Sequence, residues 1–191
     1  MYAMNIMIVG VGGQGTLLTS KVVGDVAIKS GHDVKVSEVH GMSQRGGSVV
    51  TYVKIGENIA SPLIEKGEAD FILAFEQLEA MRWADYLKKD GHFIISEQEI
   101  DPMPVITGQA KYPADVLAKV KAVFKNTVTV DALGIAKECG NIKTANTVMV
   151  GVMAKTTDIP KETWLEAIAE TVPERFLEVN VKAFSAGYDC Q

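Results

Sequence analysis

Residues 38–47 read "EVHGMSQRGG" and gather several side chains that could do chemistry. His40 and Ser43 are of the types that form a base and a nucleophile. They stand three residues apart in a predicted turn, however, and no acid can be named that would orient the histidine, which disfavours a serine hydrolase. His40 also lacks nearby partners for a metal ion. We therefore assign this stretch no catalytic residue and no metal.

Arg45 is the more informative side chain of this stretch. The chain has 19 basic residues, and only three of them are arginines. A guanidinium offers a planar fork of donors for phosphate or carboxylate, and the following Gly46 and Gly47 let the backbone approach a ligand closely. The stretch is either a contact for a ligand or partner, or a solvated loop with an incidental arginine.

A second glycine-rich stretch, "GVGGQG" at residues 10–15, lies upstream. Gly10, Gly12 and Gly15 satisfy GxGxxG between a predicted strand and a predicted helix, where free N–H groups and the helix dipole favour an anion. Glu38 stands where a dinucleotide-binding protein would place its ribose-binding acid. Gly13 and Gln14 make the turn wider and more polar than that fingerprint requires. The turn therefore predicts either NAD(P) or nucleotide binding, or packing alone.

Short apolar runs alternate with helical patterns along the chain, which predicts an α/β fold in a single domain, 1–191. We expect a three-layer, mostly parallel open sheet flanked by helices, with a Rossmann-like first half, an antiparallel hairpin element and a helical C-terminus. The turn at 56–58 predicts that "IASPLI" runs back beside the strand at 48–56. Strands are expected at 5–10, 33–39, 48–56, 69–76, 91–96 and 127–132, and helices at 15–30, 77–89, 132–139, 143–155, 160–172 and 173–186, with an irregular connection at 99–113.

Both glycine-rich stretches follow strands, and the ends of consecutive parallel strands meet at one edge of a sheet. We therefore expect the two loops to lie side by side and to outline one concave site. Its candidate binding residues are Gly10, Gly12, Gly13, Gln14, Gly15, Ser43, Gln44, Arg45, Gly46 and Gly47.

Composition excludes several classes of partner. The net charge is −5 and no lysine or arginine cluster occurs, which argues against nucleic acid. No apolar run approaches the roughly 20 residues of a membrane span, so we expect no membrane partner and a soluble, cytoplasmic protein. The two cysteines, Cys139 and Cys190, are too few for an iron–sulfur cluster, which usually needs about four thiolates.

Several segments together carry a resemblance to a known family. The chain resembles the gamma-type subunit of the 2-oxoacid:ferredoxin oxidoreductases, and most closely their indolepyruvate branch, in order from about residue 5 to residue 187. "HGMSQRGG" is far more specific than any GxGxxG pattern. The matching segments are "GVGGQG", "SEVHGMSQRGGSVV", "SPLIEKGEADFILAFEQLEAMR", "VDALGIAKECGNIKTANTVMVG" and "NVKAFSAG".

The resemblance implies a subunit that is inactive alone. In this family a 2-oxoacid is decarboxylated on thiamine diphosphate, electrons pass through [4Fe-4S] clusters to ferredoxin, and the acyl group is transferred to coenzyme A. A large alpha subunit would carry the thiamine diphosphate and the clusters, and the product would be aryl-acetyl-CoA. The resemblance maps the ten glycine-loop residues onto the signature loops of the family, with coenzyme A as the ligand that this chain would contact.

Three alternatives stay open from the sequence. The chain could serve a different 2-oxoacid, namely pyruvate, 2-oxoisovalerate or 2-oxoglutarate. It could be a stand-alone NAD(P)- or nucleotide-binding protein that uses the glycine turn directly. It could also be a purely structural partner domain without a ligand of its own.

Overall fold

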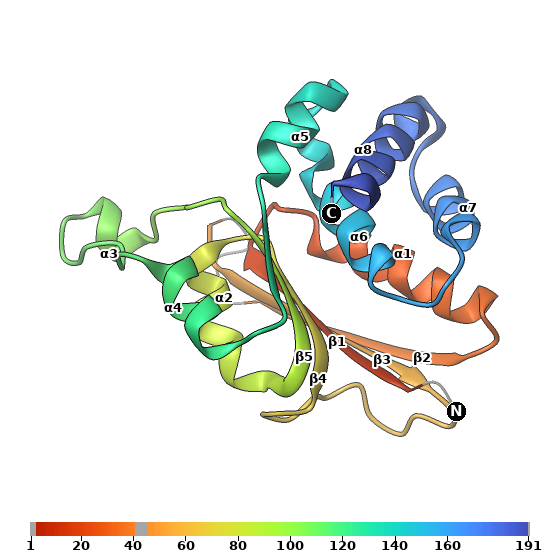
Figure 1. Cartoon of the computed structure of the whole chain (residues 1–191), viewed down its shortest axis with the longest axis horizontal. Coiled ribbons are helices and arrows are strands. Elements are labelled where there is room, and N and C mark those ends of the chain that lie inside the picture. The colour runs from red at the N-terminus through yellow and green to blue at the C-terminus, as the bar shows by residue number, and fades with distance from the viewer. Residues whose placement is uncertain (1–2, 41–45, 191) are drawn as a thin grey trace.

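The computed structural model describes residues 3–40 and 46–190, and in these residues one sheet carries helices on both faces (Figure 1). Short 3-10 turns occupy Ala84–Tyr86, Ile142–Thr144 and Glu174–Phe176. The strands are β1 (Met4–Val11), β2 (Asp33–His40), β3 (Ser48–Gly56), β4 (Ala69–Ala74), β5 (Leu87–Ser96) and β6 (Thr127–Val130). The helices are α1 (Thr16–Lys29), α2 (Gln77–Trp83), α3 (Met103–Ile106), α4 (Val116–Val123), α5 (Ala132–Cys139), α6 (Ala145–Lys155), α7 (Lys161–Thr171) and α8 (Leu177–Asp189).

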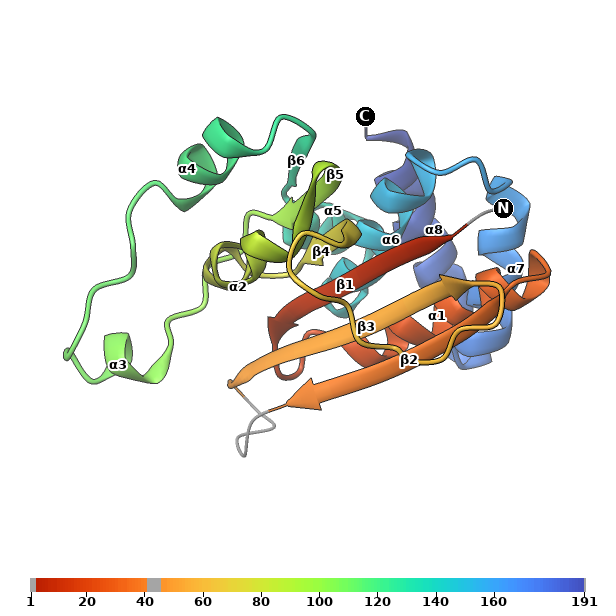
Figure 2. The ribbon, with the colours of Figure 1, turned by 90° about the horizontal axis from the view of Figure 1, so that it is seen from below.

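The strand order is β2-β3-β1-β4-β5-β6. The neighbours from β1 to β6 are parallel, whereas β3 pairs antiparallel with both β1 and β2. The prediction of a mostly parallel α/β sheet with a helical C-terminus is therefore confirmed. Figure 2 shows β2 and β3 side by side at one edge of the sheet.

The antiparallel element differs from its predicted position. Residues 59–64, "IASPLI", form no strand and do not run back beside residues 48–56. Both edges of β3 are already occupied, one by β1 and the other by β2, so no edge remains for a further partner. The β2–β3 pair is the hairpin, and the segment after β3 crosses the sheet face as a loop (Figure 2).

β1 is buried on both faces, which explains its continuous apolar sequence. Ile6 and Ile8 point into a core formed with α1, α6, α7 and α8, while Met7 and Val9 point into a second core near α2 and α4. Alternation along an extended strand sends successive side chains to opposite faces. The sheet is therefore the middle of three layers.

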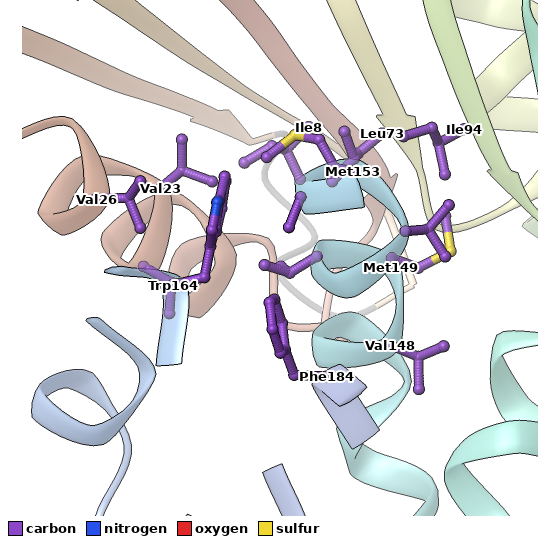
Figure 3. Close-up of a cluster of buried hydrophobic side chains, with 14 of the residues drawn as sticks. Ile8, Val23, Val26, Leu73, Ile94, Val148, Met149, Met153, Trp164 and Phe184 are labelled. Carbon is purple, nitrogen blue, oxygen red and sulfur yellow. The ribbon is translucent and has the colours of Figure 1, made fainter. Parts of the chain in front are cut away.

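The first core is the larger of the two, and Figure 3 shows its centre. Trp164 of α7 lies against Val23 and Val26 of α1, and Phe184 of α8 lies beside α6. α6 is buried almost all round, as its small and apolar residues require. Burial of each large apolar side chain contributes about 1.5–3 kcal/mol to folding.

Two boundaries on the α2–β5 side were predicted wrongly. The helix expected at 77–89 ends at Trp83, and the strand expected from residue 91 already begins at Leu87. Leu87 is buried, whereas the exposed Lys88 and Lys89 gave the segment a helical composition. The helix α4 was not predicted, and α3 interrupts the connection expected to be irregular.

The remaining helices confirm their predicted positions to within a few residues. Gly31 follows α1 with φ +80°, and its N–H donates to the carbonyl of Ile28, as expected of a glycine that ends a helix. Within the described ranges, we find no helix with the length and apolar character needed to span a membrane.

Candidate functional site

The glycine turn connects β1 to α1 at the carboxyl edge of the sheet. Gly13 and Gly15 adopt φ of +107° and +88°, values that side-chain-bearing residues rarely take. A Cβ on Gly15 would also lie 2.6 Å from Nδ2 of Asn146 in α6. Glycine is therefore required at Gly15 for two separate reasons, backbone conformation and a close helix contact.

The second glycine-rich loop lies directly beside this turn. The Gly12 N–H donates to the Gly47 carbonyl at 2.9 Å, and the Gly46 N–H donates to the Gly12 carbonyl at 3.4 Å. The predicted juxtaposition of the two loops is confirmed for these residues. Its cause is the direct pairing of β3 with β1, which sets Ser48 opposite Val11.

Part of the predicted site cannot be placed. Ser43, Gln44 and Arg45 lie outside the described residues. Their assignment as binding residues stays a prediction.

Gln14 links the glycine turn to the residues that follow β4 and β5. Its Oε1 accepts from the Val11 N–H at 2.7 Å, and its Nε2 donates to the Phe75 carbonyl at 2.8 Å and to Oε1 of Gln98 at 2.9 Å. Both amide hydrogens are thus used inside the protein, and one lone pair of Oε1 remains for a ligand.

Gly10 permits this arrangement, because a Cβ there would lie 2.7 Å from Oε1 of Gln14 and 3.2 Å from Cβ of Phe75. It shapes the site without needing to touch a ligand.

On the β3 side of the turn, the surface carries a hollow of about 370 Å³. Glu38 lines it, and its carboxylate accepts from the hydroxyls of Thr16 at 3.3 Å and Thr51 at 3.2 Å. The carboxylate therefore stands beside the first residue of α1, where the helix dipole favours negative charge. Glu38 itself supplies that charge, which makes this hollow unfavourable for a phosphate.

On the other side of the turn lies a cavity of about 510 Å³, within the range typical of small-molecule sites. It opens between the exits of β1, β4 and β5 and the helices α5 and α6, where ligands bind in open α/β sheets. Its lining residues are Gly13, Gln14, Gly15, Leu18, Phe75, Ser96, Gln98, Ala132, Leu133, Ile142, Lys143, Ala145, Asn146 and Met149. We call it the α6 cavity.

Sequence reasoning placed only the glycine turn at this cavity. It did not single out Ser96, Gln98 or Lys143. A signal was present for Ser96 and Gln98, because both follow the apolar core of a predicted parallel strand at its carboxyl end.

Two buried carboxylates support the same edge of the sheet. Glu76 caps α2 by accepting from the Glu79 N–H at 2.8 Å, and it also accepts from the Ile100 N–H and the Tyr112 hydroxyl. Glu79 accepts from the hydroxyl of Ser48, the first residue of β3. These carboxylates connect α2 to the start of β3 and to the segment after β5. Their hydrogen-bond partners offset the cost of burying them.

Neither thiol is arranged as a reactive group. Cys139 is buried in the core, and the Cys190 thiol donates to the Gly187 carbonyl at 3.1 Å. Desolvation raises the pKa of the Cys190 thiol, which lowers its thiolate fraction. Among the described residues, no group of three or more histidine, cysteine, aspartate or glutamate side chains could hold a metal ion.

Comparison with known proteins decides the relationship of this chain. A model of the family described as pyruvate ferredoxin/flavodoxin oxidoreductase matches residues 5–190. The chain belongs to this family. The resemblance inferred from the two glycine loops and the later segments is thereby confirmed.

Individual relatives within this family cover nearly the whole chain. The indolepyruvate oxidoreductase subunit IorB of Thermococcus kodakarensis is 40% identical over 190 residues, which cover 96% of this chain and 93% of that protein. The pyruvate/ketoisovalerate oxidoreductases common subunit gamma of the same organism is 27% identical, over 94% of this chain and 92% of that protein.

Solved structures of the family share the fold. The keto/oxoacid ferredoxin oxidoreductase gamma subunit from Geobacter sulfurreducens gives a TM-score of 0.72 at 26% identity, covering 97% of this chain and 96% of that one. The 2-oxoglutarate:ferredoxin oxidoreductase from Magnetococcus marinus, solved with 2-oxoglutarate, coenzyme A and succinyl-CoA, gives a TM-score of 0.73 at 18% identity. It covers 98% of this chain and 31% of that one, a likeness that establishes the fold alone. The chain is a small subunit of the 2-oxoacid:ferredoxin oxidoreductase type.

Proposed function

We propose that the chain is the small subunit of an indolepyruvate, or more generally aryl pyruvate, ferredoxin oxidoreductase. The observation that carries the proposal is the difference in sequence identity between this chain and two branches of the family. Four proteins named indolepyruvate oxidoreductase subunit IorB are 36–40% identical to this chain, whereas the shared gamma subunits for pyruvate and ketoisovalerate are 27% identical. Pyruvate, 2-oxoisovalerate and 2-oxoglutarate are the competing substrates.

The proposed enzyme needs a partner for its redox chemistry. This chain has two cysteines, one of them in the core, and a [4Fe-4S] cluster takes about four thiolates. We therefore assign the clusters to a large alpha subunit. The resemblance to the family assigns the thiamine diphosphate and the reduction of ferredoxin to the same subunit. We also propose a cytoplasmic location for this chain, the large subunit and ferredoxin. The complex would release CO2 and form aryl-acetyl-CoA.

Within this complex, the two glycine loops would hold an anionic group, either a phosphate of coenzyme A or a carboxylate at the subunit interface. The hydrogen bonds between Gly12 and the pair Gly46 and Gly47 support a shared cradle. Arg45 would supply positive charge and offset the Glu38 carboxylate that lines the hollow beside the turn. Each charge-assisted hydrogen bond would contribute about 1.5–3 kcal/mol. The loops would bind and orient the group, while the reaction itself takes place on the partner.

Affinity purification of the tagged chain from its native host tests the proposal. We expect a larger, brown subunit that contains thiamine diphosphate and iron to co-purify. Isolation of the chain as a stable, active homo-oligomer without iron would contradict the proposal.

Arg45→Ala in the assembled enzyme tests the role of the loop. We expect slower acyl transfer to coenzyme A or weaker assembly, with little change in the thermal stability of the subunit itself. A large loss of subunit stability would instead give Arg45 a structural role.

A further inference from the structure

β2 forms one edge of the sheet, and α1 packs over it on one face (Figure 2). In the described part of the chain, no strand pairs with the outer edge of β2. The Val34 N–H donates to the Asp33 carboxylate at 2.9 Å and therefore faces this open edge. Hydrogen-bonding directions alternate along an antiparallel strand, so the N–H and C=O groups of Val36 and Glu38 face it as well. The edge can accept a further strand.

A hollow of about 550 Å³ lies between α1, β2 and the end of α7. Leu17 and Ile28 of α1 and Val36 of β2 line it, and they are 51%, 61% and 44% exposed. Single exposed apolar side chains are ordinary on a protein surface, but these three surround one hollow beside an unpaired strand. The surface therefore suits a protein partner.

The charges on the same side of α1 indicate which partner fits. The side chains that line the hollow from this helix at spacings of three and four residues are Leu17, Lys21, Asp25 and Ile28. Their order along the helix is apolar, positive, negative, apolar. We call these four residues together with Val36 the α1–β2 surface.

This order is complementary to itself when a second copy of the helix runs in the opposite direction. A two-fold axis midway between Lys21 and Asp25 would set each of these side chains against the oppositely charged one of the other copy. The same axis would bring Leu17 to Ile28 of the other copy. Each contact would occur twice, as in any interface between two identical surfaces.

The edge strand permits the same axis. Directly opposite residues in a strand pair point to the same face of the sheet, so a two-fold antiparallel pair sets one residue opposite itself. An axis at Lys35 or Glu38 would oppose like charges, which is destabilising. An axis at Val36 opposes two apolar side chains instead, and Val36 lines the hollow together with α1.

We propose that the α1–β2 surface is the contact between two copies of this chain, in which β2 pairs antiparallel with β2 of the other copy and α1 packs against α1. The two sheets then form one continuous sheet. Asp25 is already oriented for its role, because its Oδ2 accepts from the Thr171 hydroxyl at 2.8 Å and its Oδ1 remains for Lys21 of the other copy.

This contact does not depend on the proposed function. It forms in the chain alone, and it would place two small subunits side by side in an assembled enzyme. A dimer of this chain without redox activity agrees with the proposed function, so the two proposals fail separately.

Sedimentation equilibrium of the full chain at about 100 μM tests the contact. We expect a dimer. Lys21→Glu should raise the dissociation constant about tenfold or more, because two carboxylates would then face each other at each contact. Lys125→Glu, at an exposed position before β6 on the opposite edge of the sheet, is the matched control and should leave the constant unchanged.

An exchange of charges tests the pairing of Lys21 with Asp25. Asp25→Lys alone should also weaken the dimer, whereas an equimolar mixture of the Lys21→Glu and Asp25→Lys chains should associate again, because opposite charges then meet at both contacts. Circular dichroism would check that Asp25→Lys is folded, since it loses its bond to Thr171. Ile28→Ser, at an exposed position, should weaken the dimer independently of charge.

Amide hydrogen exchange locates the strand contact. The Val36 N–H should exchange slowly in the dimer and faster in Lys21→Glu. A chain that stays monomeric, a dimer equally stable in Lys21→Glu and Lys125→Glu, a mixture that does not associate, or fast exchange at Val36 in the dimer would overturn the proposal. A monomeric chain whose Lys21→Glu variant loses the large subunit would assign the surface to that subunit and would equally overturn it.

Discussion

The Gln14 side chain donates from Nε2 to Oε1 of Gln98 at 2.9 Å, and this bond joins the turn after β1 to the segment after β5. The same amide holds Phe75, the residue after β4. A side chain in the middle of the glycine turn thus links the residues at the carboxyl ends of β1, β4 and β5. Gln98 in turn reaches α2, because its carbonyl accepts from the Gln77 N–H at 3.1 Å.

Gln14→Ala should lower the free energy of unfolding by about 2–3 kcal/mol, because three hydrogen bonds of about 1 kcal/mol each are lost. Urea denaturation followed by circular dichroism would measure the change. Gln109→Ala, at an exposed position after α3, is the matched control and should be nearly neutral. Equal effects in the two variants would show that the Gln14 bonds add nothing to stability.

Gly15→Ala should destabilise the protein more than Gly13→Ala. Both positions have positive φ, which costs about 1–2 kcal/mol for a residue with Cβ. Only the new Cβ at residue 15 would meet Asn146, at 2.6 Å, while that at residue 13 has nothing within 4 Å. Thermal unfolding of the two variants measures the difference.

A double variant separates the contact from the backbone strain. Gly15→Ala combined with Asn146→Ala should cost less than the sum of the two single changes, because the clash disappears. Strict additivity would contradict the contact between the turn and α6.

Gly151→Ala should lower the free energy of unfolding by about 3 kcal/mol or more, because overpacked interfaces seldom relax fully. A Cβ at this position in α6 would lie 2.1 Å from the Phe184 carbonyl of α8, and Gly187 of α8 is similarly close to Val148. Both neighbours are backbone, so the helices would have to separate.

Gly24→Ala is the matched control in a different helix. Gly24 lies within α1, and a Cβ added there would have nothing within 4 Å, so alanine should stabilise the helix by about 0.5–1 kcal/mol. Guanidinium denaturation of both variants would test the pair. A destabilised Gly24→Ala beside an unaffected Gly151→Ala would contradict the close packing of α6 against α8.

Tyr112 should make stability depend on pH in the alkaline range. Burial and the hydrogen bond to Glu76 raise the pKa of its hydroxyl, so the folded state favours the neutral phenol. In the unfolded chain tyrosine ionises near pH 10, so the stability that Tyr112 contributes is present below about pH 10 and declines above it.

Denaturation of the wild type and Tyr112→Phe between pH 8 and pH 11 checks this expectation. The wild type should lose stability more steeply above about pH 10. Burial also raises the pKa of Tyr52, but that contribution is common to both proteins. Parallel curves over the whole range would rule out a titrating role for Tyr112.

The sequence predicted the sheet well where local signals were strong. β1 and β4 are continuous apolar runs, and α1 lies within the range predicted for it. The pairing of β3 with both β1 and β2 was missed, because register between distant strands is decided by tertiary packing and leaves little trace in a local pattern.

The site was predicted in part for a similar reason. The glycine turn and its contact with Gly46 and Gly47 follow from turn chemistry and strand order. Lys143 lies in the 3-10 turn before α6 and Asn146 lies in α6, both more than 120 residues from the glycine turn, and a single sequence does not encode that proximity. The burial of Glu76 and Glu79 was not predicted either, since acidic side chains are seldom buried without a partner that the local sequence reveals.

Reconstitution with the large subunit tests the central claim most directly. The measurement is coenzyme A-dependent reduction of ferredoxin by indolepyruvate, with pyruvate and 2-oxoglutarate as competing substrates, in the presence and absence of this chain. We predict that activity requires both subunits and is highest with indolepyruvate. Full activity of the large subunit alone, or a preference for pyruvate or 2-oxoglutarate, would contradict the account.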